Sequence, residues 1–235
     1  MDLKDKTIVI TGGFGVLGAA AAEAASAKGA RPVLVDFAAR ASAGQAPRLA
    51  ANAVLLGGVD LTDPRMAEEA MAAAAAETGR IDALLNIAGG FVWQTLEEGA
   101  PEAWDRLYAM NVKTAANASR AALPWLLAAG GRGAIVNVGA NGAVKAGAGM
   151  GAYAASKAGV AKLTESLAEE LKGRGVRVNA VLPSILDTPQ NRADMPDADP
   201  GAWVAPADLA AVMLFLASDQ ARAVTGALVP VTGLV

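Results

Sequence analysis

Cysteine and histidine are both absent from the 235 residues of this chain. Without cysteine there is no disulfide, no thiolate nucleophile and no cysteine-based metal site. Without histidine, Ser-His-Asp hydrolysis and histidine-ligated metal centres are excluded as well. Proton transfer must therefore use Tyr, Lys, Asp or Glu, and we expect no metal.

Aromatic residues are also scarce: they make up 4% of a chain that is 54% hydrophobic, so Ala, Val and Leu supply most of the apolar content. Small side chains allow helices to pack closely on a parallel sheet. Every apolar stretch is broken well short of a membrane span, and a net charge of −3 without a basic stripe gives no sign of a nucleic-acid partner. The charged segment 1–6 leads directly into a strand, which predicts no secretory signal and a cytoplasmic protein with a small-molecule substrate.

Short apolar strands alternate with longer helices along the whole chain. Strands are expected at 7–10, 32–36, 54–56, 83–86, 133–138, 176–181 and 227–231, and helices at 16–28, 64–78, 101–127, 151–172 and 206–218. This order predicts an α/β fold with a doubly wound parallel sheet of the Rossmann type, in a single domain over residues 1–235. The Pro- and Asp-rich stretch 183–205 follows the sixth strand at the ligand-binding edge, which predicts a substrate or cofactor lid.

The first expected strand runs into a glycine-rich turn and then a helix. Glycines permit a tight turn and a close approach of the backbone to a pyrophosphate, which a helix N-terminus attracts. A glycine-tolerant loop without a ligand is the alternative, but the strand–turn–helix context favours dinucleotide binding. The residues expected to contact the cofactor are Gly12, Gly13, Gly15, Val16, Leu17 and Gly18.

Asp36 ends the second expected strand. A carboxylate there can accept hydrogen bonds from the adenosine ribose hydroxyls and would repel a 2′-phosphate, so NAD(H) is expected over NADP(H). The alternative is an Asp that only caps a turn. Binding of NADP(H) instead would require Arg40 or Arg31 to reach the phosphate.

Tyr153 and Lys157 stand at positions i and i+4, on one face of an expected helix. A tyrosine with an ordinary pKa of about 10 is a poor acid–base catalyst at neutral pH. A cation beside it, together with a positively charged nicotinamide, should stabilise the phenolate and lower that pKa. The usual meaning of such a pair is a solvated helix face, but its position after the fifth strand favours a reacting centre.

These motifs resemble, in order and spacing, those of the short-chain dehydrogenase/reductase family over nearly the whole chain. The resemblance implies that Tyr153 and Lys157 are the acid–base pair, that Lys157 also binds the nicotinamide ribose, and that Asn111 holds a proton-relay water. It also implies further cofactor contacts along the chain, at Asp60, Leu61, Asn86, Ala88, Gly89, Pro183, Leu186 and Thr188.

The chain departs from the family pattern at the catalytic serine, whose position is occupied by Ala140. Alanine cannot hydrogen-bond a substrate carbonyl or alcohol, so either Asn141 replaces the serine or the substrate does not need it. Two smaller departures are Val16, where the family usually has glycine, and Ser184 after Pro183.

A subgroup without this serine is dihydropteridine reductase, which the chain resembles in part, around 139–153, 181–203 and 88–91. The resemblance implies an NADH-dependent reductase of a small conjugated substrate, with a quinonoid dihydropterin as the single best substrate and Phe91 and Trp93 beside it. The alternatives are an ordinary ketone or alcohol oxidoreductase that uses Asn141, and a non-catalytic dinucleotide-binding protein.

Two expectations concern surfaces. The aromatic residues Phe91, Trp93 and Trp203 lie near the expected pocket mouth, although packing in the core or lid is the commoner role of such residues. The Ala-rich faces of the helices at 101–127 and 151–172 indicate packing between subunits, as in the family's homodimers and homotetramers.

Overall fold

The computed structural model describes residues 3–235, apart from the side chain of Pro47. Met1 and Asp2, which begin the charged N-terminal segment discussed above, lie outside the described residues. A seven-stranded sheet has the order β3-β2-β1-β4-β5-β6-β7, and all its pairs are parallel. The strands are β1 (Thr7–Thr11), β2 (Arg31–Asp36), β3 (Val54–Gly57), β4 (Ala83–Asn86), β5 (Gly133–Val138), β6 (Val176–Pro183) and β7 (Leu228–Val231). The predicted doubly wound fold is confirmed, and the strand order reverses between β1 and β4, where such folds form their ligand crevice.

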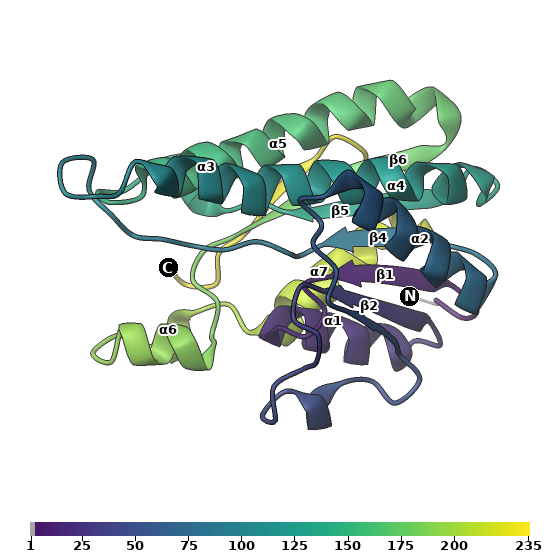
Figure 1. Ribbon diagram of the computed structural model, residues 1–235, viewed down its shortest axis with the longest axis horizontal. Helices are drawn as coiled ribbons and strands as arrows, with labels where there is room; N and C mark the ends of the chain where they lie inside the picture. The colour runs from purple at the N-terminus through teal and green to yellow at the C-terminus, as the bar shows by residue number, and fades with distance from the viewer. Residues whose placement is uncertain (1–2) are drawn as a thin grey trace.

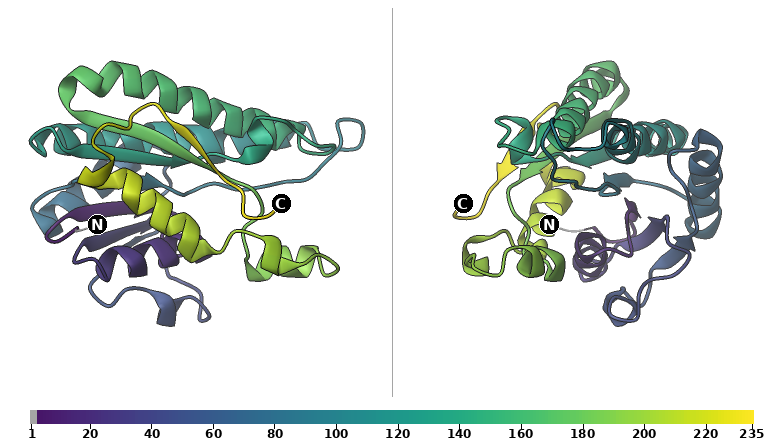
Figure 2. Two further views of the ribbon diagram at one scale, coloured as in Figure 1. Left: turned by 180° about the vertical axis from the view of Figure 1, so that it is seen from behind. Right: turned by 60° about the vertical axis from the view of Figure 1, so that its left-hand side comes forward.

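Helices cover both faces of the sheet (Figures 1 and 2). They are α1 (Val16–Ser26), α2 (Pro64–Thr78), α3 (Glu102–Tyr108), α4 (Thr114–Ala128), α5 (Gly151–Leu171), α6 (Pro189–Asp194) and α7 (Pro206–Ala217). Side chains of β1 alternate between two cores: Ile8 and Ile10 pack with α1 and α7, whereas Val9 packs with α2 and α4. Full burial of each such side chain contributes about 1.5–3 kcal/mol, so each face of the sheet is held by its own helices.

The prediction of a single helix over 101–127 is wrong in one respect. A π turn at Ala109–Lys113 separates α3 from α4. At its centre, the Asn111 side chain hydrogen-bonds the backbone of Gly90 in a distant loop. That tertiary contact is invisible to a helical pattern, which is a local property of the sequence.

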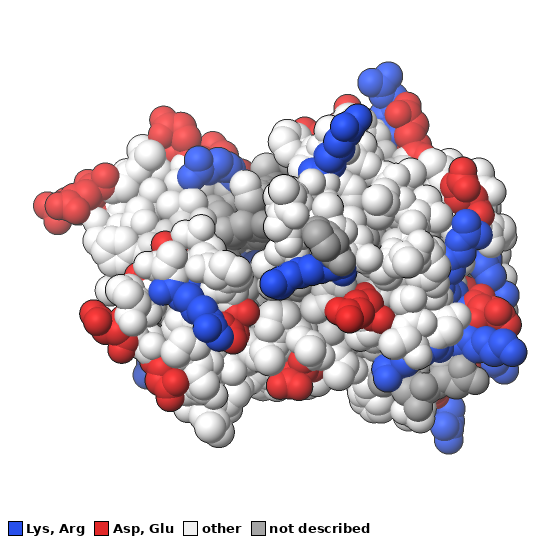
Figure 3. Space-filling view, turned by 90° about the horizontal axis from the view of Figure 1, so that it is seen from below, with Lys and Arg blue, Asp and Glu red and all other residues white. Residues whose placement is uncertain are grey.

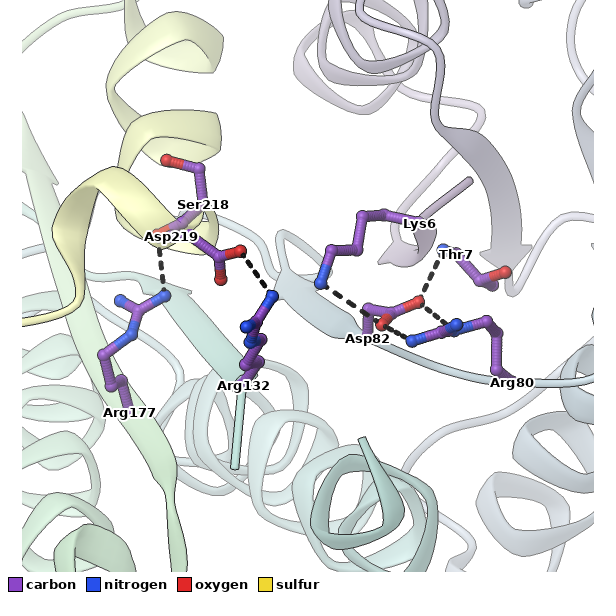
Figure 4. A network of polar contacts seen from close by, with 8 residues as sticks. All are labelled: Lys6, Thr7, Arg80, Asp82, Arg132, Arg177, Ser218 and Asp219. Carbon is purple, nitrogen blue, oxygen red and sulfur yellow. Dashed lines mark hydrogen bonds and ion pairs between the residues drawn. The ribbon is translucent and has the colours of Figure 1, made fainter. Parts of the chain in front are cut away.

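Charged contacts join the amino ends of the strands (Figure 4). Asp82 accepts hydrogen bonds from the backbone N–H of Thr7, at 2.9 Å, and from Arg80, at 2.6 and 2.8 Å. Arg177 of β6 donates to the carbonyl oxygens of Leu216 and Ser218 at the end of α7. The carboxyl ends of the strands are therefore left to the connecting loops.

The segment 183–205 is less loop-like than predicted. It contains α6 and a parallel bridge between Leu186 and Val204. Helix α6 projects beyond the sheet at the same end as the long loop between β4 and α3 (Figures 1 and 2). Trp203 is only 7% exposed, so it anchors this segment to the core and does not stand at the pocket mouth.

The surface in Figure 3 carries acidic and basic side chains side by side, without a stripe of one sign. Across residues 3–235, helices that combine the length and apolar character needed to cross a membrane are lacking.

Candidate active site

The glycine-rich turn after β1 forms one end of the candidate site. Gly12 has a left-handed φ of +64°, and a Cβ on Gly18 would overlap the carbonyl oxygen of Gly12. Helix α1 begins after Gly15, and within the described chain no side chain caps it. Its first N–H groups are therefore available to an anion, which a helix N-terminus attracts. This turn fits a pyrophosphate, because glycine stands at the positions where a larger side chain would block the backbone.

Asp36 combines both roles weighed from the sequence. Its carboxylate accepts hydrogen bonds from the N–H groups of Phe14 and Ala38, each at 2.9 Å, so it does cap a turn. It also lines the pocket described below, as Arg40 does. Arg31 begins β2 at the other end of the sheet and donates to the carbonyl oxygen of Glu77, so the alternative in which Arg31 reaches a 2′-phosphate is wrong.

A groove of about 1090 Å³ runs along the carboxyl ends of the strands, from the glycine-rich turn to α6. Most of the predicted cofactor contacts line it: Gly12, Gly15, Val16, Leu17, Gly18, Asp36, Asp60, Leu61, Ala88, Gly89 and Thr188.

Four other predicted cofactor contacts, Gly13, Asn86, Pro183 and Leu186, are not among the residues that line the groove. A Cβ on Gly13 would overlap Leu34 of β2, so Gly13 allows the turn to pack on the sheet. Asn86 is 4% exposed and donates to Ser119 and Asn137, which makes it a tie between β4, β5 and α4. Pro183 ends β6, and Leu186 packs against the core.

Tyr153 and Lys157 lie on the first turns of α5, at the edge of β5. The Lys157 ammonium donates to the carbonyl oxygen of Val138 at 2.8 Å, and a Cβ on Gly89 would lie 3.4 Å from its Nζ. Lys157 is therefore held close to Gly89, which lines one end of the groove.

Burial sets the protonation of both groups. It raises the pKa of Tyr153 to about 12 and lowers the pKa of Lys157 to about 8. The expected lowering of the Tyr153 pKa depends on Lys157 together with a positively charged nicotinamide. In the protein by itself, loss of hydration disfavours the phenolate and the Lys157 ammonium is bonded to Val138. At neutral pH the phenol is protonated, as an ordinary tyrosine is, and the raised pKa makes it a weaker acid.

Asn111 joins three parts of the site. Its Nδ2 donates to the Ser156 hydroxyl at 2.8 Å and to the Gly90 carbonyl at 3.1 Å, and its Oδ1 accepts from the Gly90 N–H at 2.9 Å. The Ser156 hydroxyl donates in turn to the Tyr153 carbonyl oxygen at 2.7 Å. The side chain thus ties the loop after β4 to the helix that carries Tyr153.

Ala140 and Asn141 follow β5 with different surroundings. Ala140 is 4% exposed in extended backbone, so the missing serine hydroxyl is replaced by a buried methyl group. Asn141 is exposed, and its side chain makes no hydrogen bond to any described residue. Its amide is free to meet a ligand, whereas Ala140 offers only apolar contact.

Two exposed aromatic side chains stand beside the reacting centre. The Phe91 ring lies nearly perpendicular to the Tyr153 ring, with centroids 4.8 Å apart. Phe91 and Trp93 are 56% and 60% exposed. Of the three aromatics considered from the sequence, Phe91 contacts Tyr153, and Trp93 follows two residues later in the same loop. These two exposed side chains are called the aromatic wall below.

Several residues of the site were missed from the sequence. Met110, which precedes Asn111, lines the groove and packs on Gly90. Phe37 also lines the groove directly after Asp36. Met110 and Phe37 adjoin the predicted residues Asn111 and Asp36, and that proximity was the only signal in the sequence for their place in the site. The contact of Ser156 with Asn111 depends on the π turn and had no such signal.

The model of the short chain dehydrogenase family matches residues 6–199, and the chain belongs to the short-chain dehydrogenase/reductase family. Meso-2,3-butanediol dehydrogenase of Serratia marcescens is 36% identical over 241 residues, which cover 99% of this chain and 95% of that protein. D-threitol dehydrogenase of Mycolicibacterium smegmatis is 36% identical over 236 residues, 96% of this chain and 90% of that protein.

Solved structures agree with this assignment. One is a 3-ketoacyl-(acyl-carrier-protein) reductase from Brucella melitensis, complexed with NADH, with a TM-score of 0.87 and 29% sequence identity. The match covers 99% of this chain and 98% of that chain. The chain is therefore an oxidoreductase that uses a nicotinamide dinucleotide, which decides against the non-catalytic alternative.

Proposed function

We propose that this enzyme uses NAD(H) in preference to NADP(H) and transfers hydride to a small, flat, conjugated substrate, with Tyr153 as the proton donor. A quinonoid dihydropterin is the single substrate that fits best. The observation that carries the proposal is the combination at the reacting centre: a buried methyl group at Ala140 and an exposed aromatic wall of Phe91 and Trp93. A conjugated ring gains contact area and a π face from that wall, and its spread charge needs no second hydroxyl donor.

Different residues of the groove bind different parts of the cofactor. The uncapped start of α1 and the glycine-rich turn hold the pyrophosphate, and Asp36 holds the adenosine ribose, with Asp60 and Leu61 further along the wall. Lys157 binds the second ribose, and Thr188 contacts the carboxamide. The bound nicotinamide supplies the hydride.

Tyr153 donates its proton to the substrate from a phenol that is neutral at physiological pH, as an ordinary tyrosine is. The Asn111 side chain is engaged by Gly90 and Ser156. Asn111 therefore holds the relay water through the backbone of its π turn, a local geometry that recurs at functional sites. The relay returns a proton to Tyr153 after each turnover.

Cofactor choice gives the first prediction. Because the Asp36 carboxylate lines the groove, kcat/KM with NADH should exceed that with NADPH by at least about tenfold, which corresponds to roughly 1.4 kcal/mol. The measurement is steady-state kinetics with each cofactor, and Asp36→Ala should reduce the ratio. Equal or better use of NADPH by the wild type would contradict the proposal and assign the phosphate to Arg40.

Substrate class gives the second prediction. We expect NADH oxidation to be faster with quinonoid dihydropterin, flat diketones and quinones than with simple ketones. One spectrophotometric panel at a fixed NADH concentration compares them. A preference for simple ketones over every flat compound would overturn the substrate proposal and leave the cofactor proposal standing.

The second candidate is an oxidoreductase of alcohols, diols or ketones in which Asn141 takes the place of the missing serine. The relatives named for butanediol and threitol favour it, as does the free Asn141 amide. In that case Asn141→Ala should abolish ketone reduction.

Assembly and location complete the proposal. The enzyme forms a homodimer or homotetramer in the cytoplasm, through the faces of α4 and α5, where Trp125 is 38% exposed. The segment 183–205 serves as the lid, since Thr188, Pro189 and Gln190 line the groove.

A further inference from the structure

Two loops that are distant in the sequence meet beside the reacting centre. One connects β4 to α3 and the other connects β5 to α5. The Trp93 indole N–H donates to the Ala148 carbonyl oxygen at 3.0 Å, and the Gln94 backbone N–H donates to the Gly149 carbonyl oxygen at 2.9 Å. One side-chain bond and one backbone bond therefore join adjacent residues of the two loops.

Gly149 is the residue that permits this contact. Its φ is +72°, and a Cβ at this position would overlap the Trp93 indole. Any other side chain at 149 would strain the backbone and displace the indole ring.

The contact has a direct bearing on Tyr153. Phe91 lies two residues before Trp93, and its ring is perpendicular to that of Tyr153 at a centroid distance of 4.8 Å. The other side of the contact is close as well, because α5, which carries Tyr153, begins at Gly151. The contact between Trp93 and Gly149 therefore lies close in sequence to Phe91 on one loop and to the start of the Tyr153 helix on the other.

We propose that Trp93 and Gly149 form a lock that positions Phe91 against Tyr153 and so sets the shape of the substrate site. Both are positioning residues: they act through Phe91 and the start of α5. The inference rests on the proposed function only in the choice of substrate probes, because the lock itself has a readout that needs no substrate.

The test is a double-mutant cycle with Gly149→Ala and Trp93→Ala. The matched control is Gly79→Ala, because Gly79 has a similar φ of +80° at the end of α2 and a Cβ there meets nothing within 4 Å. It reproduces the left-handed strain without the overlap. Each variant is assayed with 9,10-phenanthrenequinone as the flat probe and 2,3-butanedione as the small one, beside the KM for NADH.

We expect Gly149→Ala to lower kcat/KM by about tenfold or more for any probe that the wild type reduces, as misplaced groups at a reacting centre do. The KM for NADH should stay within about twofold of the wild-type value. Trp93→Ala should have a similar effect. The double variant should be no worse than the poorer single variant, because residues that act through one contact are not additive. Gly79→Ala should leave kcat/KM unchanged.

Hydrogen exchange of the Gln94 amide tests the lock without a substrate. Exchange should become faster in Gly149→Ala and Trp93→Ala and stay at the wild-type rate in Gly79→Ala. If the wild type reduces neither probe, that result counts against the proposed reduction of flat conjugated substrates, and this measurement still decides the lock. Unchanged Gln94 exchange in both variants, or additive losses in the cycle, would overturn the lock.

Discussion

Tyr153→Phe should lower kcat by about 100- to 10,000-fold, the contribution expected of a general acid, while the affinity for NADH stays near that of the wild type. The phenylalanine keeps the ring that packs against Phe91 and removes only the hydroxyl. Because that hydroxyl is the proton donor of the proposed mechanism, the variant loses the donor and little else. Single-turnover kinetics and a fluorescence titration with NADH measure the two quantities separately.

Two variants provide the controls for this prediction. Tyr108→Phe changes the only other tyrosine of the chain, which is 54% exposed on α3, and should leave kcat unaffected. Lys157→Ala should impair both turnover and NADH binding, because the same ammonium serves the ribose and the reacting centre. Near wild-type turnover in Tyr153→Phe would mean that water or another group supplies the proton.

Ala140→Ser should raise the reduction of simple ketones by about 100- to 1000-fold, the usual effect of one donor on a developing alkoxide. The same change should leave the reduction of quinonoid dihydropterin unchanged or lower it, because charge in a conjugated ring does not concentrate on one oxygen. Ala140 is 4% exposed, so the hydroxyl must fit a small buried space. Steady-state kinetics of both proteins on both substrate types measure the effect.

Ala140→Gly is the matched control, since it changes size at the same position without adding a donor. Asn141→Ala distinguishes the two candidate functions. If the wild type ignores pterins, reduces ketones well and loses that activity in Asn141→Ala, then the alcohol and ketone oxidoreductase is the correct assignment.

Most of the fold was predictable because it depends on local patterns. Short apolar runs such as 133–138 occupy buried parallel strands, and alternation within β1 divides Ile8 and Ile10 from Val9 between the two cores. The glycine-rich turn and Asp36 were also predictable, since a strand, a turn and a helix that follow one another in sequence lie together in space.

The remaining features depend on contacts between distant segments. The π turn at Asn111 lies beside Gly90, and the raised pKa of Tyr153 comes from its burial in the folded chain. Trp93 and Gly149 are 56 positions apart (149 − 93), and no motif links the two positions. Composition and spacing do not record such pairings.

The contacts of Asp82, Arg80, Arg132 and Arg177 stand at the opposite end of the sheet from the groove (Figure 4). The loops at the carboxyl ends of the strands can therefore change in sequence while the charged contacts at the amino ends stay in place. Substitutions in those loops leave the sheet's charged anchors untouched. This separation suits a scaffold whose relatives, at 36% identity, are named for two substrates, butanediol and threitol.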